Sequence, residues 1–287
     1  MIPVYHRLPA WTHFLYYRAV MHAVSEKAVD EPTLADLLDL EEIDRDLYRA
    51  NLVFDDPLPL YGGQVAAQAL AAAGRTVDAD RLPHSLHGYF LRPGDATRPT
   101  IFHVDRDRDG GSYSARRVVA VQNGEVIFNM SASFHRREEG VDREAHPERP
   151  EGDPEQLPSG GMPRLFSMQG ALPPQPYPDR QWPTRFWARC RLDLPDDPLI
   201  HACVLTYLSD ISSGVAAFGN EEASASSSLD HAVWFHRPGR LDDWVHMDLV
   251  PQSVAGGRGW YTGTVRTRDG VLLASLAQEC LFRNRRR

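Results

Sequence analysis

Two stretches of the chain place apolar residues at the period of an α-helix, and each precedes a group of strand-like stretches. The first lies within residues 62–77 and is so rich in Ala and Gly that its side chains are small nearly all round. The second runs from Ile200 through Phe218 and carries an apolar stripe. The stretches that follow alternate apolar and polar residues, as strands do. The pattern predicts two units of one helix and several strands, and a helix with such small sides suits close wrapping by a curved sheet.

The sequence repeats itself once, at an offset of about 145 residues. Tyr-Phe-Leu-Arg-Pro-Gly at residues 89–94 returns as Trp-Phe-His-Arg-Pro-Gly at residues 234–239. In the same order, Asn123-Gly124 between two alternating stretches returns as Asp269-Gly270 between two more. These dipeptides predict hairpins, because a type I′ turn needs positive φ at both central residues. The repeat therefore predicts an α+β fold of two similar units, each a curved antiparallel sheet around a central helix.

Composition divides the chain into four segments. Residues 1–32 form an N-terminal extension, and residues 33–136 form the first unit. Residues 137–183 carry repeated Pro and Gly with little apolar periodicity, which predicts a linker. Residues 184–287 form the second unit.

The charge balance excludes several classes of function. The chain has 31 basic and 39 acidic side chains and a net charge of −8, so its surface as a whole repels nucleic acid and anionic membranes. Lys27 is the single lysine and lies in a polar segment, which excludes a P-loop and a Schiff-base enzyme, because both need a placed lysine. Charged residues also interrupt the apolar stretch near the N-terminus, so we expect no membrane span.

Cysteine usage and short motifs exclude further classes. Cys190, Cys203 and Cys280 are far apart and odd in number, which argues against a disulfide framework and a zinc site and favours a reducing compartment, the cytoplasm. The sequence contains no Gly-x-Ser-x-Gly, no His-Glu-x-x-His and no complete Gly-x-Gly-x-x-Gly. Serine-hydrolase, zincin and Rossmann functions therefore lose their usual support. We expect no metal and no cofactor.

Two polar residues occupy positions where the pattern calls for apolar ones. Gln278 is the polar exception on the apolar face of the last strand, and the repeat places Ala132 at the equivalent position. A buried amide needs a partner, which can be backbone, water or substrate. Asp210 lies at the edge of the buried face of the second helix, whereas the first helix carries no acid. A satisfied structural role is the usual explanation for such residues. His84 is a less favoured candidate for a general base.

Several short segments in both units form a recognisable set of sequence motifs. Those of the first unit are Gly62-Gly63-Gln64-Val65, Gln68-Ala69-Leu70, the run His-Ser-Leu-His-Gly-Tyr-Phe-Leu-Arg-Pro-Gly-Asp at 84–95, and Ser114-Ala115-Arg116-Arg117-Val118. Those of the second unit are Ser209-Asp210, Leu229-Asp230-His231, Trp234-Phe235-His236-Arg237-Pro238, and Gln278-Glu279 before Arg283-Asn284. This set resembles the acyl-CoA thioesterase II family over about residues 34–136 and 184–284. The resemblance implies a double hotdog, in which two hotdog units are covalently linked.

The resemblance also implies a reaction and a site. In that family an Asp, a Thr and a Gln hold and activate the attacking water, and these positions fall on Asp210, Ser228 and Gln278. Ser228 departs from the family pattern, and the repeat places Pro83 opposite it. Serine keeps the hydroxyl group but lacks the methyl group that restricts χ1. The implied activity is hydrolysis of acyl-CoA thioesters to free fatty acid and CoA.

The sequence also offers candidate residues for substrate binding and leaves two alternative functions open. Backbone N–H groups at a helix start, at Gly62 and Gly63, are candidate oxyanion donors. The candidate ligands of the CoA phosphates are Arg92, Arg116, Arg117 and Arg237. A non-catalytic acyl-CoA or lipid binder stays open, as does an enoyl-CoA hydratase, although residues 94–99 lack the His that hydration requires. Family analogy favours a homo-oligomer.

Overall fold

The computed structural model describes residues 33–53, 58–162, 165–178, 183–211, 213–219 and 223–284, so the predicted N-terminal extension lies outside the described residues. Within these ranges fourteen strands form one sheet with neighbours in the order β1-β2-β4-β5-β6-β3-β11-β14-β13-β12-β9-β8-β7, and β10 pairs with β14. Every pairing is antiparallel.

The bounds of the elements follow the chain. The strands of the first unit are β1 (Glu41–Asp44), β2 (Leu47–Ala50), β3 (Arg81–Phe90), β4 (Thr100–Asp109), β5 (Tyr113–Gln122) and β6 (Glu125–Arg136). The later strands are β7 (Ser159–Gly161), β8 (Met168–Ala171), β9 (Arg185–Cys190), β10 (Ala223–Ser228), β11 (Asp230–Phe235), β12 (Val245–Ala255), β13 (Arg258–Thr267) and β14 (Leu272–Asn284). The helices are α2 (Leu34–Leu38), α3 (Gly62–Gly74), α4 (Pro198–Ser209) and the 3₁₀ turns η1 (Pro154–Gln156) and η2 (Ser213–Phe218).

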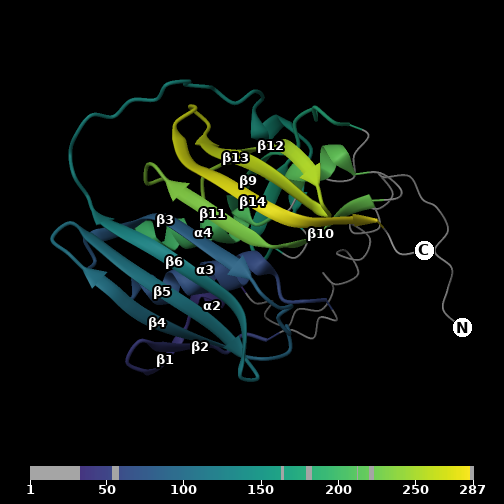
Figure 1. The fold of residues 1–287 in the computed structure, drawn as a ribbon. Helices are drawn as coiled ribbons and strands as arrows, with labels where there is room; N and C mark the ends of the chain where they lie inside the picture. Colours follow the sequence, from purple (N-terminus) through teal and green to yellow (C-terminus); the bar gives the residue numbers. More distant parts are fainter. Residues whose placement is uncertain are drawn as a thin grey trace, which may run out of the picture.

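Strand register confirms the predicted repeat. In the first unit His87 on β3 lies opposite Ser131 on β6, and in the second unit Ala232 on β11 lies opposite Ala277 on β14, at offsets of 232 − 87 = 145 and 277 − 131 = 146. β3 and β11 also pair with each other and join the two half-sheets (Figure 1). His87 lies opposite Ala232 in that pairing. Equivalent residues of the repeat therefore meet there, on a pseudo-two-fold axis.

The two central helices lie side by side on the inner face of the sheet (Figure 1). In α3 every residue from Gly63 to Gly74 is buried, as its small side chains predict. The end of α3 meets the start of α4, since a Cβ at Gly74 would lie 2.4 Å from Leu199. The start of α3 meets the end of α4, since a Cβ at Gly62 would lie 2.4 Å from Asp210 Oδ2. The helices are therefore antiparallel, and each end of the pair brings together the two units.

The second helix differs from its prediction at both ends. It begins at Pro198, where the Asp197 side chain accepts a hydrogen bond of 2.9 Å from the Leu199 N–H, and it ends at Ser209. The predicted continuation to Phe218 is wrong, because Asp210 leaves the helix with φ −84° and ψ 50°. The apolar period runs on because the 3₁₀ turn η2 also packs into the core through residues such as Val215. Periodicity alone does not distinguish these two geometries.

Both predicted hairpins are present, but their turns differ. Asn123 and Gly124 have φ of 52° and 77°, as a type I′ turn requires. At the β13–β14 turn Gly270 has φ 91° and Asp269 has no positive φ. The Gly270 N–H there donates to the carbonyl of Thr267 over 3.0 Å, which closes a longer loop. The type I′ prediction is therefore confirmed in the first unit and wrong in the second.

Part of the Pro/Gly-rich segment 137–183 is built into the second unit's sheet. It contains β7 and β8, and β8 pairs with β9. The segment Pro198–Phe218 is apolar and long enough to pass as a membrane-spanning helix by length and composition, but 76% of its most apolar window is buried inside the fold. That burial is typical of a core helix. The three cysteines are free and buried.

Candidate active site

Asp210, Ser228 and Gln278 come together in one hydrogen-bonded cluster. Asp210 Oδ1 accepts hydrogen bonds from Ser228 Oγ at 2.7 Å and from Gln278 Nε2 at 2.5 Å. Gln278 Nε2 also donates to Ser228 Oγ at 2.5 Å. Asp210 follows α4, Ser228 ends β10 and Gln278 lies in the middle of β14, so three separate elements supply the cluster. The structure therefore brings together the three residues that the sequence singled out.

Tyr261 fixes the orientation of the Gln278 amide. It lies on β13 directly opposite Gln278, and its hydroxyl group donates to Gln278 Oε1 at 2.8 Å. Because the oxygen of the amide accepts from Tyr261, its nitrogen must face Asp210 and Ser228. Both Tyr261 and Gln278 are fully buried. Gly214 of η2 packs against the Tyr261 ring so closely that a Cβ there would lie 2.1 Å from it.

The start of α3 completes the cluster from the first unit. The Gly63 N–H donates to the Asp210 carboxylate, and Gly62 faces Asp210 Oδ2 and the Phe90 ring. Glycine is required at position 62, because any Cβ would overlap the carboxylate. The Asp210 carboxylate is thus the partner of the Gly63 N–H in this structure, and the use of that N–H as an oxyanion donor stays a prediction. A substrate role for Gly62 stays a prediction.

Burial sets the acidity of Asp210. The side chain is 4% exposed, and burial raises its pKa to about 6. Hydrogen bonds from Ser228, Gln278 and the Gly63 N–H act in the opposite direction and lower that pKa. The N-terminal end of α3 also favours the anion, because the helix dipole is positive there. Asp210 is therefore mostly ionised at neutral pH and readily protonated at slightly acidic pH, as a general base should be.

The raised pKa predicts a pH-dependent stability. The unfolded chain releases the Asp210 proton near pH 4 and the native protein near pH 6, so between these values the native state binds more protons and stability falls as pH rises. The loss should total about 3 kcal/mol in the free energy of unfolding. About two thirds of this loss falls between pH 4.5 and 7.5, where urea unfolding measures it, and in Asp210→Asn it should disappear. Asp269→Asn, at a carboxylate whose side chain is 87% exposed, is the control. Equal pH slopes in the Asp210→Asn variant and the parent would contradict the raised pKa.

Of the histidines considered from the sequence, His231 lies next to the cluster, since a hydrogen bond with Gln278 acts on its pKa, and His84 does not. His231 is fully buried, burial lowers its pKa to about 4, and its Nε2 lies 2.7 Å from Ser209 Oγ. Asp230 points away from it, accepting from the Glu279 N–H and lying 3.1 Å from His87 Nε2. The expectation that Asp230 and His231 form no dyad is confirmed. His84 lies elsewhere, lining another cavity with its Nε2 2.7 Å from Ser133 Oγ.

The hydrogen bonds and ion pairs of the four candidate arginines go to other parts of the described chain. Arg92 and Arg237 repeat one structural role, in which Nη1 donates to the carbonyl of Val126 at 2.8 Å and of Leu272 at 2.9 Å. Arg117 is half exposed and pairs with two aspartates on β4.

Arg116 is 1% exposed, which excludes it as a phosphate ligand. Its guanidinium donates to Thr76 and Asp109, so the predicted CoA-binding role is wrong for Arg116. The repeat makes it the equivalent of Tyr261, since Arg116 lies opposite Ala132 as Tyr261 lies opposite Gln278.

Sequence reasoning missed Tyr261. It was hidden because an alternating strand pattern treats Tyr as an ordinary apolar residue. Strand register would have revealed it, since pairing the two strands about the turn at Asp269-Gly270 places Tyr261 opposite Gln278. Among the described residues, no group of three or more His, Cys, Asp or Glu side chains is placed to hold a metal ion.

Comparison with known proteins places the chain in a family. Residues 56–135 match the model of the acyl-CoA thioesterase N-terminal domain, and residues 131–282 match the model of the C-terminal domain. Acyl-coenzyme A thioesterase 8 of Rattus norvegicus is 34% identical, over 88% of this chain and 89% of the relative. Acyl-CoA thioesterase 2 of Haemophilus influenzae is 31% identical, over 87% of this chain and 96% of the relative.

Solved structures agree with this placement. The crystal structure of an acyl-CoA thioesterase II from Mycobacterium marinum is 37% identical, with a TM-score of 0.70, over 87% of this chain and 98% of that chain. A protein from Alicyclobacillus acidocaldarius described as having a hot dog fold is 18% identical, with a TM-score of 0.70, over 88% of this chain and 97% of that chain, and it shows the fold alone. The double hotdog prediction is confirmed, and the chain belongs to the acyl-CoA thioesterase II family.

Proposed function

We propose that Asp210, Ser228 and Gln278 hold and activate the water with which this acyl-CoA thioester hydrolase cleaves its substrate. The hydrolase activity itself follows from family membership. The observation that supports the proposed roles is the cluster itself: one buried carboxylate whose Oδ1 accepts from a hydroxyl and an amide at 2.7 and 2.5 Å. Burying an ionisable acid costs free energy, and use as a base in the reaction is a function that offsets this cost.

The proposed hydrolysis needs only water and the side chains of the cluster, because every proton and the leaving group are accounted for. Water attacks the thioester carbonyl carbon while Asp210 takes one of its protons, and the C–S bond then breaks to release the CoA thiolate. That leaving group has a pKa near 8.5, so it needs no strong acid. The proton on Asp210 passes to the departing thiolate, which regenerates the carboxylate and yields fatty acid and CoA. Oδ1 of Asp210 already accepts two hydrogen bonds, so Oδ2, which faces the start of α3, is the oxygen for the water.

Three measurements separate the hydrolase from the two alternatives. Free-thiol release from a panel of acyl-CoA substrates supports the hydrolase, and addition of water to crotonyl-CoA without thiol release supports a hydratase. Calorimetric binding of acyl-CoA without either product supports a binding protein. If the Asp210→Ala and Gln278→Ala variants release thiol as fast as the parent, the proposed site is wrong even though the activity stands.

Ser228 gives a direct test of the hydroxyl group. Ser228→Thr should retain the kcat of the parent or raise it, because the added methyl group restricts χ1 while the hydroxyl group remains. Ser228→Ala should lower kcat about 10- to 100-fold, the usual effect of removing a hydrogen bond to a charged group. Steady-state thiol release at pH 7.5 measures both. An alanine variant as fast as the serine parent would remove Ser228 from the site.

We also propose the cytoplasm as the location. The support is that all three cysteines are buried free thiols.

A further inference from the structure

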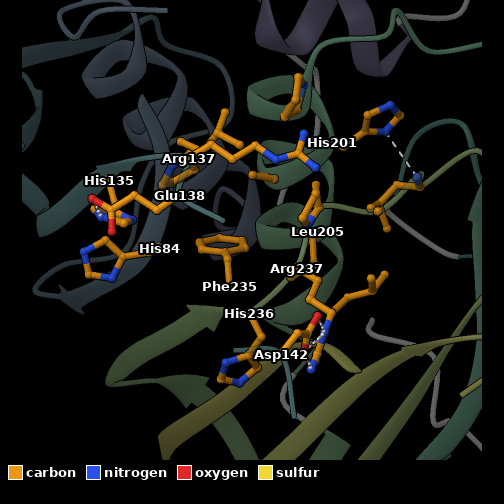
Figure 2. A pocket seen from close by; sticks show the side chains of 18 residues that line it. His84, His135, Arg137, Glu138, Asp142, His201, Leu205, Phe235, His236 and Arg237 are labelled. Carbon is orange, nitrogen blue, oxygen red and sulfur yellow. Dashed lines mark hydrogen bonds and ion pairs between the residues drawn. The ribbon is translucent and has the colours of Figure 1, made fainter. Parts of the chain in front are cut away.

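A cavity of about 320 Å³ lies between the two units, away from the Asp210 cluster (Figure 2). The start of β3, the end of β6, α4 and the end of β11 surround it. Apolar side chains such as Leu205 and Phe235 line it together with His84, His236 and Arg137. Its volume lies at the lower end of the range of small-molecule sites. Nothing in the catalytic cluster explains this cavity, because the two share no residue.

The repeat makes the backbone around this cavity the counterpart of the backbone around the Asp210 cluster. Near the catalytic cluster, the N–H groups of Leu91 and Arg92 donate to the Ile127 carbonyl at 2.9 and 3.3 Å. At the cavity, the N–H groups of His236 and Arg237 donate to the Leu273 carbonyl at 2.8 and 3.3 Å. The offsets are 145 and 146, as elsewhere in the fold.

The aromatic walls correspond as well. Phe90 contacts the Gly62 position beside Asp210. Its equivalent at the offset of 145, Phe235, lines the cavity.

The groups that would activate water are missing at the cavity's end of the pseudo-dimer. Arg75 caps the end of α3 where Asp210 caps the end of α4. Pro83 stands at the position of Ser228, and Ala132 at that of Gln278. The cavity therefore shares the backbone and the aromatic side chain found near the catalytic cluster, but it lacks the equivalents of the acid, the hydroxyl group and the amide.

We propose that this cavity is a second binding site for CoA and its thioesters, one that binds without hydrolysing. An apolar lining with several neutral hydrogen-bonding groups suits the pantetheine arm, a chain of methylene groups and amides. Burial lowers the pKa of His84, His201 and His236, so at neutral pH these imidazoles are uncharged partners for amides. Of the two acids that line the cavity, Asp142 pairs with Arg237 and Glu138 lies 3.4 Å from His135.

Arg137 supplies a positive charge at the rim. It is exposed, and its side chain extends over the cavity toward α4 in Figure 2. A guanidinium at that place is suited to a phosphate group of CoA at the mouth of the cavity.

Calorimetric titration of the full chain with a non-hydrolysable thioether analogue of acyl-CoA tests the proposal. We expect two molecules bound per chain, and a stoichiometry of one would overturn the proposal. Ala202→Trp, which fills the cavity from α4, should reduce the stoichiometry to one and leave kcat unchanged. Arg137→Glu, a surface change that cannot disturb the core, should weaken one of the two sites at least tenfold.

The controls separate this site from the catalytic one. Arg143→Glu changes another exposed arginine of the same segment that does not line the cavity, and it should bind two molecules with the affinities of the parent. Asp210→Asn should keep both sites while losing turnover, so an active Asp210→Asn variant would overturn the catalytic proposal and leave this one standing. Two molecules bound with the affinities of the parent in both Ala202→Trp and Arg137→Glu would place the second site elsewhere and overturn its assignment to this cavity.

Discussion

Replacing Asp210 with asparagine is expected to lower kcat for thioester hydrolysis by about 10²- to 10⁴-fold, the contribution of a positioned general base. Asparagine has almost the same shape, and its amide oxygen can still accept from Ser228 and Gln278. The variant therefore keeps the cluster and loses only the group that takes the proton from water. KM should change little, because Asp210 is buried among its own partners. Thiol release under saturating acyl-CoA measures the loss.

The pH profile separates a lost base from a damaged fold. In the parent, kcat/KM should rise tenfold per pH unit below about pH 6 and level off above it, because burial raises the pKa of Asp210 to about 6. The residual activity of Asp210→Asn should lack this limb. Asp230→Asn is the matched control, since Asp230 is a nearby carboxylate whose partners are His87 and the Glu279 N–H. An Asp210→Asn variant within tenfold of the parent, or one that retains the acidic limb, would exclude Asp210 as the base.

The repeat made much of the fold predictable. Hairpins and glycine-rich turns mark strand ends locally, and two copies at one offset fix which strands correspond. The small side chains of α3 predicted a helix enclosed on all sides, which the burial of Gly63 through Gly74 confirms. β7 and β8 were not predictable in this way, because three- and four-residue strands rich in Gly form only where β9 offers them an edge.

The site was predictable only in part, for a physical reason. Gln278 broke an apolar alternation, and Asp210 was an acid beside a buried stripe, so each was visible from its neighbours along the chain. Their contact is not visible in this way, because 68 residues separate them and the end of α4 has to unwind to deliver the carboxylate. For Arg116 the sequence predicted a ligand role that the structure does not support. A positive charge suggests a phosphate ligand, but Arg116 is buried and holds Thr76 and Asp109 together.

Removing the Gln278 side chain should be the second most damaging change. Gln278→Ala is expected to lower kcat about 10²- to 10³-fold, similar to the loss of one preorganised donor in an active site. Two effects combine. The water loses one of the groups that orient it, and Asp210 loses a hydrogen bond that lowers its pKa. The acidic limb of the kcat/KM profile should therefore move to higher pH, which a profile from pH 5 to 9 measures.

Tyr261→Phe shows whether the orientation of the amide matters in addition to its presence. The ring and its packing against Gly214 remain, while the hydroxyl group that holds Gln278 Oε1 is removed. The amide can then rotate so that its oxygen faces Asp210, which disfavours the carboxylate form. We expect a loss in kcat of about 3- to 10-fold, the size of one neutral hydrogen bond, together with a shift of the acidic limb in the direction seen for Gln278→Ala. A lower kcat with an unmoved limb would mean that Tyr261 only packs, and Gln278→Ala with the kcat of the parent would mean that the amide takes no part in activating water.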